Sequence, residues 1–293
     1  MGKQPSNAGP HGVVVIDKPA GWTSHDVVAK SRGVLGTRKV GHSGTLDPDA
    51  TGVLVLGVGR ATRLLRFLTE LPKSYDGEIV LGIETSTLDA TGDITATHDM
   101  TSVTAGQVVA VAGELTGNLM QVPPMVSAIK IDGRRLHELA REGKEIERPP
   151  RPVHVSRFDI EPVEGEPLVY KCSVDCSSGT YIRSLAADLG TMLGGGAHLR
   201  SLRRTSVGGF GLDQAGTIEA PTLLPIGAAV GHLEVAIVAD DRAAAVGHGR
   251  VLPIEELGVS GGGPWAVFDS ERELLAVYES HKHGAKPTVV ISR

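Results

Sequence analysis

The sequence GHSGTLDPDATG at residues 41–52 decides how the rest of the chain can be interpreted. It is polar, contains three glycines and is followed by the apolar run VLVLGV at residues 53–58. Such a run is typical of a buried strand. Glycine permits tight turns and the close approach of a ligand, and Pro48 favours an extended backbone at Asp47. The stretch therefore predicts a loop that aims one carboxylate, Asp47, although an ordinary Asp-Pro turn has the same local sequence.

The composition of the chain is that of an ordinary globular protein. It has 293 residues, of which 41% are apolar and 3% aromatic, and its net charge is −5. This length suffices for one large domain and a small one. Because the net charge is negative, a nucleic-acid surface would have to be local. No run of about 18 apolar residues is present, so we expect no membrane span.

The cysteine pattern and the amino-terminal residues indicate a cytoplasmic protein. Cys172 and Cys176 alternate with Val174 on a predicted strand, and we expect them on its buried face. One such pair does not predict a disulfide or a metal site. Residues 1–10 lack the apolar segment of a signal peptide and are expected to form a disordered leader.

Hydrophobic periodicity and turn residues predict a mixture of strands and helices. We expect strands at residues 12–17, 53–58, 74–82, 127–131, 153–163 and 168–176. We expect helices at residues 23–35, 61–68, 104–115, 134–141 and 180–193. Short strands follow at residues 265–268, 274–278 and 287–291. This pattern predicts a large domain at residues 11–235 and a small β-barrel at residues 236–293.

Arg183 does not fit the local rules for helix starts. If Thr180 caps the helix, Arg183 lies at the third helical position, where an acidic side chain is favoured. A cation there costs about 0.3–1 kcal/mol. A buried carboxylate, for which Asp47 is one candidate, would reverse this effect, and a tolerated surface arginine is the alternative.

Two of the four tyrosines, Tyr75 and Tyr181, are further candidates. Each could pack in the core or stack on a flat ligand, and the sequence pattern leaves both open. The GHSGT motif lacks the last glycine of a serine-hydrolase nucleophile elbow. GVGRAT at residues 57–62 lacks the third glycine of a dinucleotide fingerprint. No metal-binding or phosphate-loop motif is present, which favours an enzyme without a metal or a cofactor.

Several blocks of sequence together resemble the TruB family, the bacterial tRNA pseudouridine-55 synthases. The main blocks are DKPAGWTS at residues 17–24, GHSGTLDP with ATG at 41–52, KSY at 73–75 and SGTYIRSL at 178–185. QVPP at residues 121–124 and LRR at 202–204 also match, and order and spacing agree over residues 11–215. Val126 stands where many members of the family have a tyrosine, which affects packing or RNA contact and not the chemistry.

The resemblance implies an α+β protein with a pseudouridine-synthase fold. It has a central mixed, mainly antiparallel sheet with flanking helices, here at residues 11–235, and a small PUA-like β-barrel at residues 236–293. The implied reaction converts uridine 55 in the T-loop of tRNA to pseudouridine, with base flipping and no cofactor. A non-catalytic RNA-binding or tRNA-folding chaperone module on the same scaffold is the alternative.

The resemblance also implies a role for each active-site residue. Asp47 would be the catalytic aspartate, acting at the ribose C1′ or at the uracil ring. Arg183 would pair with Asp47 and hold it ionised. Tyr75 would stack on the flipped uracil, Tyr181 would support the pocket, and Leu202 would close its apolar side.

The remaining implied roles concern RNA binding. His42 would occupy the space that the flipped base leaves. Phosphate contacts are expected from cationic side chains, namely Lys18, Arg63, Lys130, Arg203 and Arg204. The expected partner is the T-stem-loop of tRNA, with no membrane, no obligatory protein partner and no metal. The resemblance favours a monomer.

Overall fold

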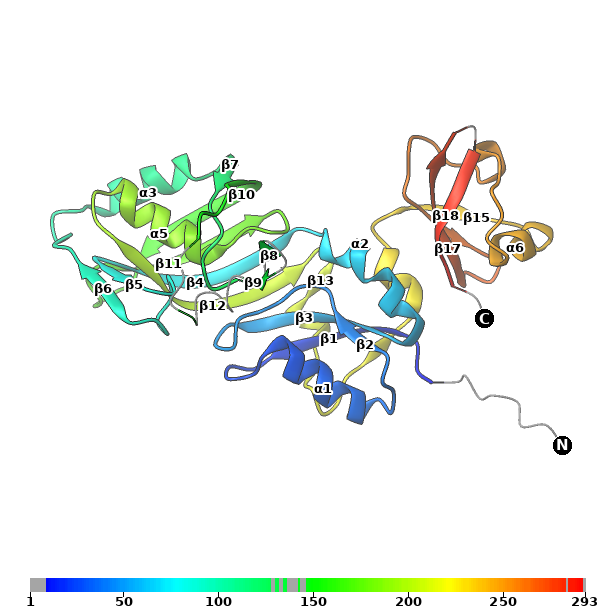
Figure 1. The fold of residues 1–293 in the computed structure, drawn as a ribbon, viewed down its shortest axis with the longest axis horizontal. Coiled ribbons are helices and arrows are strands. Elements are labelled where there is room, and N and C mark those ends of the chain that lie inside the picture. Colours follow the sequence, from blue (N-terminus) through cyan, green and yellow to red (C-terminus); the bar gives the residue numbers. More distant parts are fainter. Residues whose placement is uncertain are drawn as a thin grey trace. The chain divides into compact units, whose positions relative to one another are not determined.

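A computed structural model of the chain describes residues 9–127, 130–131, 134–135, 142, 146–282 and 284–291 (Figure 1). The chain divides into two compact units. Unit 1 comprises Met1–Pro48, Val53–Thr69 and Gly209–Arg293, and unit 2 comprises Asp49–Gly52 and Glu70–Gly208. Of the leader predicted at residues 1–10, residues 1–8 lie outside the described residues.

Unit 1 begins with a small sheet that is covered by one helix. Its elements are β1 (Gly12–Lys18), α1 (Ser24–Val34), β2 (Val40–His42), β3 (Thr51–Val58), η1 (Gly59–Leu64) and α2 (Leu65–Thr69), with β13 (Phe210–Gly211), η2 (Leu212–Gln214), β14 (Leu223–Leu224) and η3 (Ile226–Val230) later in the chain. The strand order is β14-β1-β3, and β2 pairs with β3. Val27 and Val28 of α1 pack against Leu54 and Leu56 of β3 in one buried cluster. The predicted buried strand after the GHSGTLDPDATG loop is therefore confirmed.

Helix α1 begins where the sequence predicts. The side chain of Thr23 accepts a hydrogen bond from the Asp26 amide at 3.0 Å, and the Asp26 carboxylate accepts one from the Thr23 amide at 2.9 Å. This reciprocal capping box satisfies amides that have no partner inside the helix. It fixes the first turn of α1.

Unit 2 is built on a larger sheet with helices on one face (Figure 1). Its elements are β4 (Lys73–Leu81), β5 (Ile83–Thr85), β6 (Ile94–Thr97), α3 (Ala105–Glu114), β7 (Gly117–Gln121), β8 (Lys130–Ile131), β9 (Arg134–Arg135), β10 (Arg151–Pro162), β11 (Val169–Cys176), α5 (Ile182–Met192) and β12 (Ala197–Val207). The antiparallel order is β12-β4-β11-β10-β7, and the start of β3 pairs with β12 in parallel. The predicted mixed, mainly antiparallel sheet is therefore confirmed.

The two cysteines lie on the buried face of β11, as predicted. Both thiols are free and buried. Burial raises the pKa of the Cys172 thiol to about 12 and that of the Cys176 thiol to about 11. Neutral thiols in a core pack as small apolar groups.

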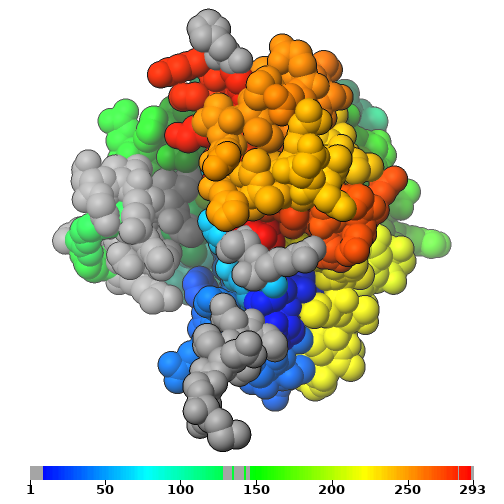
Figure 2. Space-filling model, turned by 90° about the vertical axis from the view of Figure 1, so that its right-hand side faces the viewer, coloured from blue at the N-terminus to red at the C-terminus, as the bar shows by residue number. Residues whose placement is uncertain are grey.

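A separate small sheet forms the carboxyl-terminal part of unit 1. It contains β15 (Glu234–Ile237), β16 (Trp265–Phe268), β17 (Leu274–His281) and β18 (Gly284–Val290), next to α6 (Asp240–Gly247) and η4 (Ile254–Glu256). The strand order is β15-β16-β17-β18, with β15 parallel to β16. Trp265 and Tyr278 are completely buried in its core. Figure 2 shows the surface of this region in orange and red.

The structure corrects several boundaries. The helix predicted at residues 134–141 is wrong at its start, because Arg134 and Arg135 form strand β9, and residues 136–141 lie outside the described residues. Residues 59–64 form a 3₁₀ turn before the short helix α2. Strand β15 was not predicted and begins at Glu234. The predicted domain boundary between residues 235 and 236 stays a prediction.

None of the helices in the described ranges combines the length and hydrophobicity of a membrane span.

Candidate active site

The backbone on both sides of Asp47 is held by hydrogen bonds within unit 1. On one side, the Leu46 amide donates to the Ser24 hydroxyl at 2.8 Å, and this hydroxyl donates to the Leu46 carbonyl at 3.1 Å. On the other side, the Pro48 carbonyl accepts from the Gly21 amide at 3.0 Å. Asp47 itself is half-buried. The carboxylate of Asp47 is therefore carried by a backbone segment that hydrogen bonds hold in place on both sides.

The side chain of Lys18 also holds the Asp47 loop. This corrects its expected role as a phosphate contact. Its ammonium donates to the carbonyls of Pro48 at 2.8 Å, Trp22 at 2.6 Å and Pro19 at 3.0 Å. These acceptors use the three N–H donors that a lysine possesses. Because Lys18 is 0% exposed, it does not fit a phosphate contact, and it acts instead as a support of the Asp47 loop.

His42 lies at the start of the loop, at the end of β2. It pairs with Leu56 of β3, and its Nδ1 accepts a hydrogen bond from the Gly44 amide at 3.3 Å. The neighbouring Ser43 is 2% exposed. A buried hydroxyl does not fit the exposed nucleophile of a serine hydrolase.

In unit 2, the register of β4 and β12 places the predicted pocket residues on one face of the sheet. Tyr75 lies opposite Arg204, and Gly77 lies opposite Leu202. Directly opposite residues share a face, as do residues two apart in a strand. Tyr75 and Leu202 are therefore neighbours on the same face, and Tyr75 is 9% exposed.

Of the two arginines after Leu202, only Arg204 departs from the predicted phosphate contact, and the contact of the half-buried Arg203 stays a prediction. Arg204 is 2% exposed, so it does not fit a phosphate contact. Arg203 faces the opposite side of the sheet and donates from Nη1 to the Thr51 hydroxyl at 3.2 Å. Arg203 thereby ties β12 to the residues that follow Asp47 in the chain.

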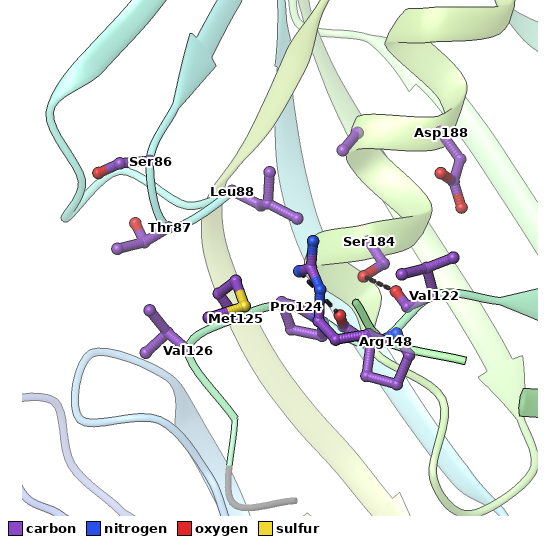
Figure 3. Close-up of a pocket in the computed structure, with 12 residues that line it drawn as sticks. Ser86, Thr87, Leu88, Val122, Pro124, Met125, Val126, Arg148, Ser184 and Asp188 are labelled. Carbon is purple, nitrogen blue, oxygen red and sulfur yellow. Dashed lines mark hydrogen bonds between the residues drawn. The ribbon is translucent and has the colours of Figure 1, made fainter. Parts of the chain in front are cut away.

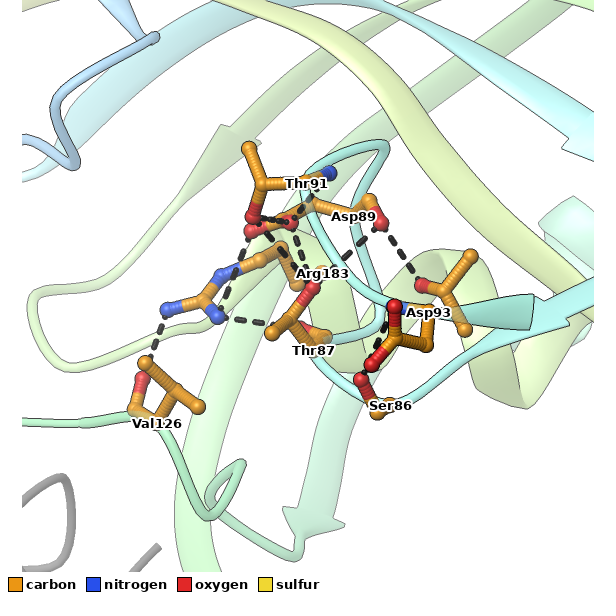
Figure 4. Close-up of polar contacts among 8 residues, drawn as sticks. Ser86, Thr87, Asp89, Thr91, Asp93, Val126 and Arg183 are labelled. Carbon is orange, nitrogen blue, oxygen red and sulfur yellow. Dashed lines mark hydrogen bonds and ion pairs between the residues drawn. The ribbon is translucent and has the colours of Figure 1, made fainter. Parts of the chain in front are cut away.

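Arg183 is buried at the start of α5, and Figure 4 shows its polar contacts. Helix α5 begins at Ile182, so Arg183 is its second residue and not its third, and Tyr181 is the N-cap. Nη1 donates to the Thr87 carbonyl at 3.0 Å, and Nη2 donates to the Val126 carbonyl at 2.8 Å. The guanidinium is thus held in one orientation from two sides.

A carboxylate that the sequence analysis did not select pairs with Arg183. Oδ2 of Asp89 lies 3.4 Å from Nη1 of Arg183. The other oxygen, Oδ1, accepts from the hydroxyls of Thr87 and Thr91, each at 2.6 Å (Figure 4). In the sequence, the only signal for this role of Asp89 was its position between Thr87 and Thr91 in a polar loop. The predicted pairing of Arg183 with Asp47 joins residues of different units and stays a prediction.

Tyr181 is fixed through its backbone. The Gln121 side chain accepts from the Tyr181 amide at 2.8 Å and donates to the Tyr181 carbonyl at 3.1 Å. Gln121 is 3% exposed, which explains a polar residue at the end of β7. The start of α5, and with it Arg183, is therefore anchored to the segment at residues 121–126.

A cavity of about 260 Å³ lies beside this anchored segment (Figure 3). It is lined by the β5–β6 loop at Ser86–Leu88, by residues 122–126, by Arg148 and by α5 residues Ser184, Ala187 and Asp188. Arg148 donates to the Pro123 carbonyl at 3.2 Å. The cavity thus adjoins the carbonyl groups that hold Arg183.

The sequence matches two models of known protein families. The model described as "TruB family pseudouridylate synthase (N terminal domain)" matches residues 32–182, more than half of the chain. The model described as "tRNA pseudouridylate synthase B C-terminal domain" matches residues 183–229. The chain belongs to the TruB family of pseudouridylate synthases.

Full-length relatives agree with this membership. A Streptomyces coelicolor protein named tRNA pseudouridine synthase B is 50% identical, over 96% of this chain and 97% of its own length. A protein of the same name from Rhodococcus jostii is 46% identical, over 96% of this chain and 93% of its own length. The resemblance of the sequence blocks to the TruB family is confirmed.

Solved structures confirm the TruB-like fold at lower identity. A chain in the crystal structure of a Cbf5-Nop10-Gar1 complex is 28% identical with a TM-score of 0.73, covering 99% of this chain and 87% of its own. A chain in the structure of an H/ACA RNP bound to a substrate RNA containing 2′-deoxyuridine is 26% identical with a TM-score of 0.72, covering 97% and 86%.

Two other predicted RNA contacts of this TruB-family chain stay predictions. Arg63 is exposed on η1 and donates from Nη1 to the Val290 carbonyl. Lys130 lies in strand β8.

Proposed function

We propose that this chain isomerises uridine 55 in the T-loop of tRNA to pseudouridine. The observation that carries the proposal is the 50% identity, over 96% of the chain, to a protein named tRNA pseudouridine synthase B. The fixed backbone on both sides of Asp47 supports it, because a catalytic group needs a constant position. The substrate is tRNA, so we place the enzyme in the cytoplasm and expect it to act as a monomer without an obligatory protein partner.

The reaction needs no redox change. The N1–C1′ bond of uridine breaks, the uracil turns, and a C5–C1′ bond forms. The proton on C5 is lost, and N1 gains one from solvent. Asp47 acts as the nucleophile at C1′ or at the uracil ring, which divides one difficult step into two easier ones. This chemistry requires neither a metal nor a cofactor.

The other side chains orient Asp47 and the base. We propose that Arg183 holds Asp47 ionised, because a nearby cation favours the carboxylate form. Tyr75 stacks on the flipped uracil, Leu202 closes the apolar side of the pocket, and Tyr181 supports it. The burial of Tyr75 at the sheet and the fixed guanidinium of Arg183 support these roles.

Binding of tRNA combines base flipping with phosphate contacts. Extruding a base costs a few kcal/mol, and His42 offsets part of this cost by filling the vacated space. Arg63, Lys130 and Arg203 are the proposed phosphate contacts, and the PUA-like domain at residues 236–293 adds RNA-binding surface. Affinity should therefore fall steeply as the salt concentration rises.

Tritium release tests the proposal directly. A tRNA transcript made with 5-tritiated uridine should release one tritium per molecule, because only the C5 proton of the target uridine is lost. A transcript in which uridine 55 is replaced by cytidine should release none. Binding without release would instead indicate the non-catalytic chaperone, and equal release from both transcripts would overturn the position assigned here.

A further inference from the structure

We propose that His25, on the exposed side of α1, is a positioning residue that fixes the ring of His42 for tRNA binding. This inference rests on the proposed function, in which His42 fills the space of the flipped base. The rings of His25 and His42 lie 5.4 Å apart between centroids, with an interplanar angle of 82°. Aromatic rings prefer such edge-to-face contacts, in which the positive edge of one ring meets the negative face of the other.

The backbone next to His25 is tied to the Asp47 loop. Ser24, the residue before it, donates to and accepts from the backbone of Leu46. The capping box between Thr23 and Asp26 holds the turn that carries His25. The position of His25 relative to the loop is therefore set by hydrogen bonds, and the contact with His42 does not depend on a mobile helix end.

His42 is held on two other sides. Its backbone pairs with Leu56 in the β2–β3 ladder, and its Nδ1 accepts from the Gly44 amide at 3.3 Å. The contact with His25 adds a third constraint on the ring. A ring fixed before binding loses less entropy when RNA binds, which increases affinity.

The exposure of the two histidine rings distinguishes a positioning role of His25 from ordinary core packing. His25 is exposed and His42 is half-buried, so neither ring belongs to the hydrophobic core of unit 1. Replacing His25 by alanine should leave folding intact, because alanine is the best helix former. Any loss of tRNA affinity then reports on the contact between the rings.

The first test uses the free protein. With ¹³C-labelled histidines, the His42 ring signal, assigned with the variant His42→Gln, should shift in His25→Ala because the neighbouring ring is gone. It should not shift in Ala29→Gln, a control at an exposed position one turn further along α1. An unchanged His42 signal in His25→Ala would overturn the contact.

The second test is a double-mutant cycle on tRNA affinity at constant salt. His25→Ala should weaken binding by about three- to tenfold, the range of one aromatic pair. His25→Phe should restore most of this loss, since it keeps an aromatic ring. In the His42→Gln background, His25→Ala should have no further effect. Additive losses would overturn the proposal and indicate that His25 contacts RNA by itself.

The outcomes distinguish this inference from the proposed function. A wild-type chain that binds tRNA but releases no tritium would refute the isomerase, while the cycle still decides the role of His25. A wild-type chain that releases tritium, with additive losses in the cycle, would refute only the role of His25. A wild-type chain that does not bind tRNA would overturn both.

Discussion

The guanidinium of Arg183 and the carboxylate of Asp89 form an ion pair at the start of α5, with Nη1 3.4 Å from Oδ2. Arg183 is 5% exposed, and Asp89 is 19% exposed. A cation in the first turn of a helix opposes the helix dipole. Asp89 and the two carbonyl acceptors of Arg183 offset this cost and orient the guanidinium.

The first prediction concerns Asp89. Asp89→Asn keeps an oxygen for the threonine hydroxyls but removes the negative charge beside Arg183. We expect the single-turnover rate to fall at least about tenfold, because a hydrogen bond to a charged group contributes ~1.5–3 kcal/mol. Affinity for tRNA should change less than about threefold. Asp93→Asn, in the same loop, is the matched control, and equal rates in both variants would show that Asp89 does not orient Arg183.

The second prediction concerns Arg183 itself. Arg183→Lys keeps the charge but cannot reach the Thr87 and Val126 carbonyls and the Asp89 carboxylate together, because lysine donates from a single point. We expect a loss of about ten- to hundredfold in turnover, the effect of one or two lost charge-assisted hydrogen bonds. Single-turnover tritium release measures it. A wild-type rate would mean that the planar guanidinium is dispensable.

The third prediction tests Asp47. Asp47→Asn should abolish tritium release, because the amide is no nucleophile. Binding of tRNA should stay within about tenfold of wild type, or ~1.4 kcal/mol. Filter binding and tritium release on the same preparation measure both. Residual turnover near the wild-type level would refute the catalytic role, and Asp49→Asn serves as the neighbouring control.

The fourth prediction concerns the glycine that ends the loop. Gly52 has a φ of +99°, and an added Cβ would lie 2.2 Å from the Arg204 carbonyl oxygen. Gly52→Ala should therefore destabilise the fold by about 1–3 kcal/mol. Activity should also fall, since the pairing of β3 with β12 has to shift. In Gly33→Ala an added Cβ meets nothing within 4 Å, so thermal unfolding should occur at or above the wild-type temperature. Equal destabilisation in both variants would contradict the steric argument.

The fifth prediction concerns pH and Lys73. Burial, with a contribution from Arg204, lowers the pKa of the Lys73 ammonium from 10.5 to about 8. The unfolded chain therefore binds more protons than the folded one between about pH 8 and 10, and stability due to this group rises with pH there. The urea midpoint of wild type, relative to Lys73→Met, should increase between pH 7.5 and about 9.5.

The cysteines have the opposite effect on the pH dependence of stability. The raised pKa values of Cys172 and Cys176, about 12 and about 11, keep the folded thiols neutral after the unfolded ones ionise. Stability from these groups therefore falls above about pH 9. This fall is shared by wild type and Lys73→Met, except for the part of the Cys176 pKa shift that Lys73 itself causes. A constant gap between the two urea midpoints would contradict the lowered pKa of Lys73.

The sequence by itself determined the features that depend on neighbouring residues. The apolar run after the loop predicted the buried strand β3, and the pattern at residues 23–35 predicted the helix α1. The alternation of Cys172 and Cys176 predicted their burial. These signals are local, because periodicity and capping involve residues only a few positions apart. The family resemblance added the pseudouridine-synthase fold and the catalytic role expected of Asp47.

Only the tertiary structure decided which charged side chains meet. Arg183 bonds to a carbonyl 96 positions away, and Lys18 to one 30 positions away, so no local pattern reports either contact. Lys18 and Arg204 looked like RNA contacts because a cation in the sequence carries no sign of burial. Asp89 had no distinguishing motif. The physical reason is that burial and pairing of charges arise from packing between distant segments, which composition and periodicity do not encode.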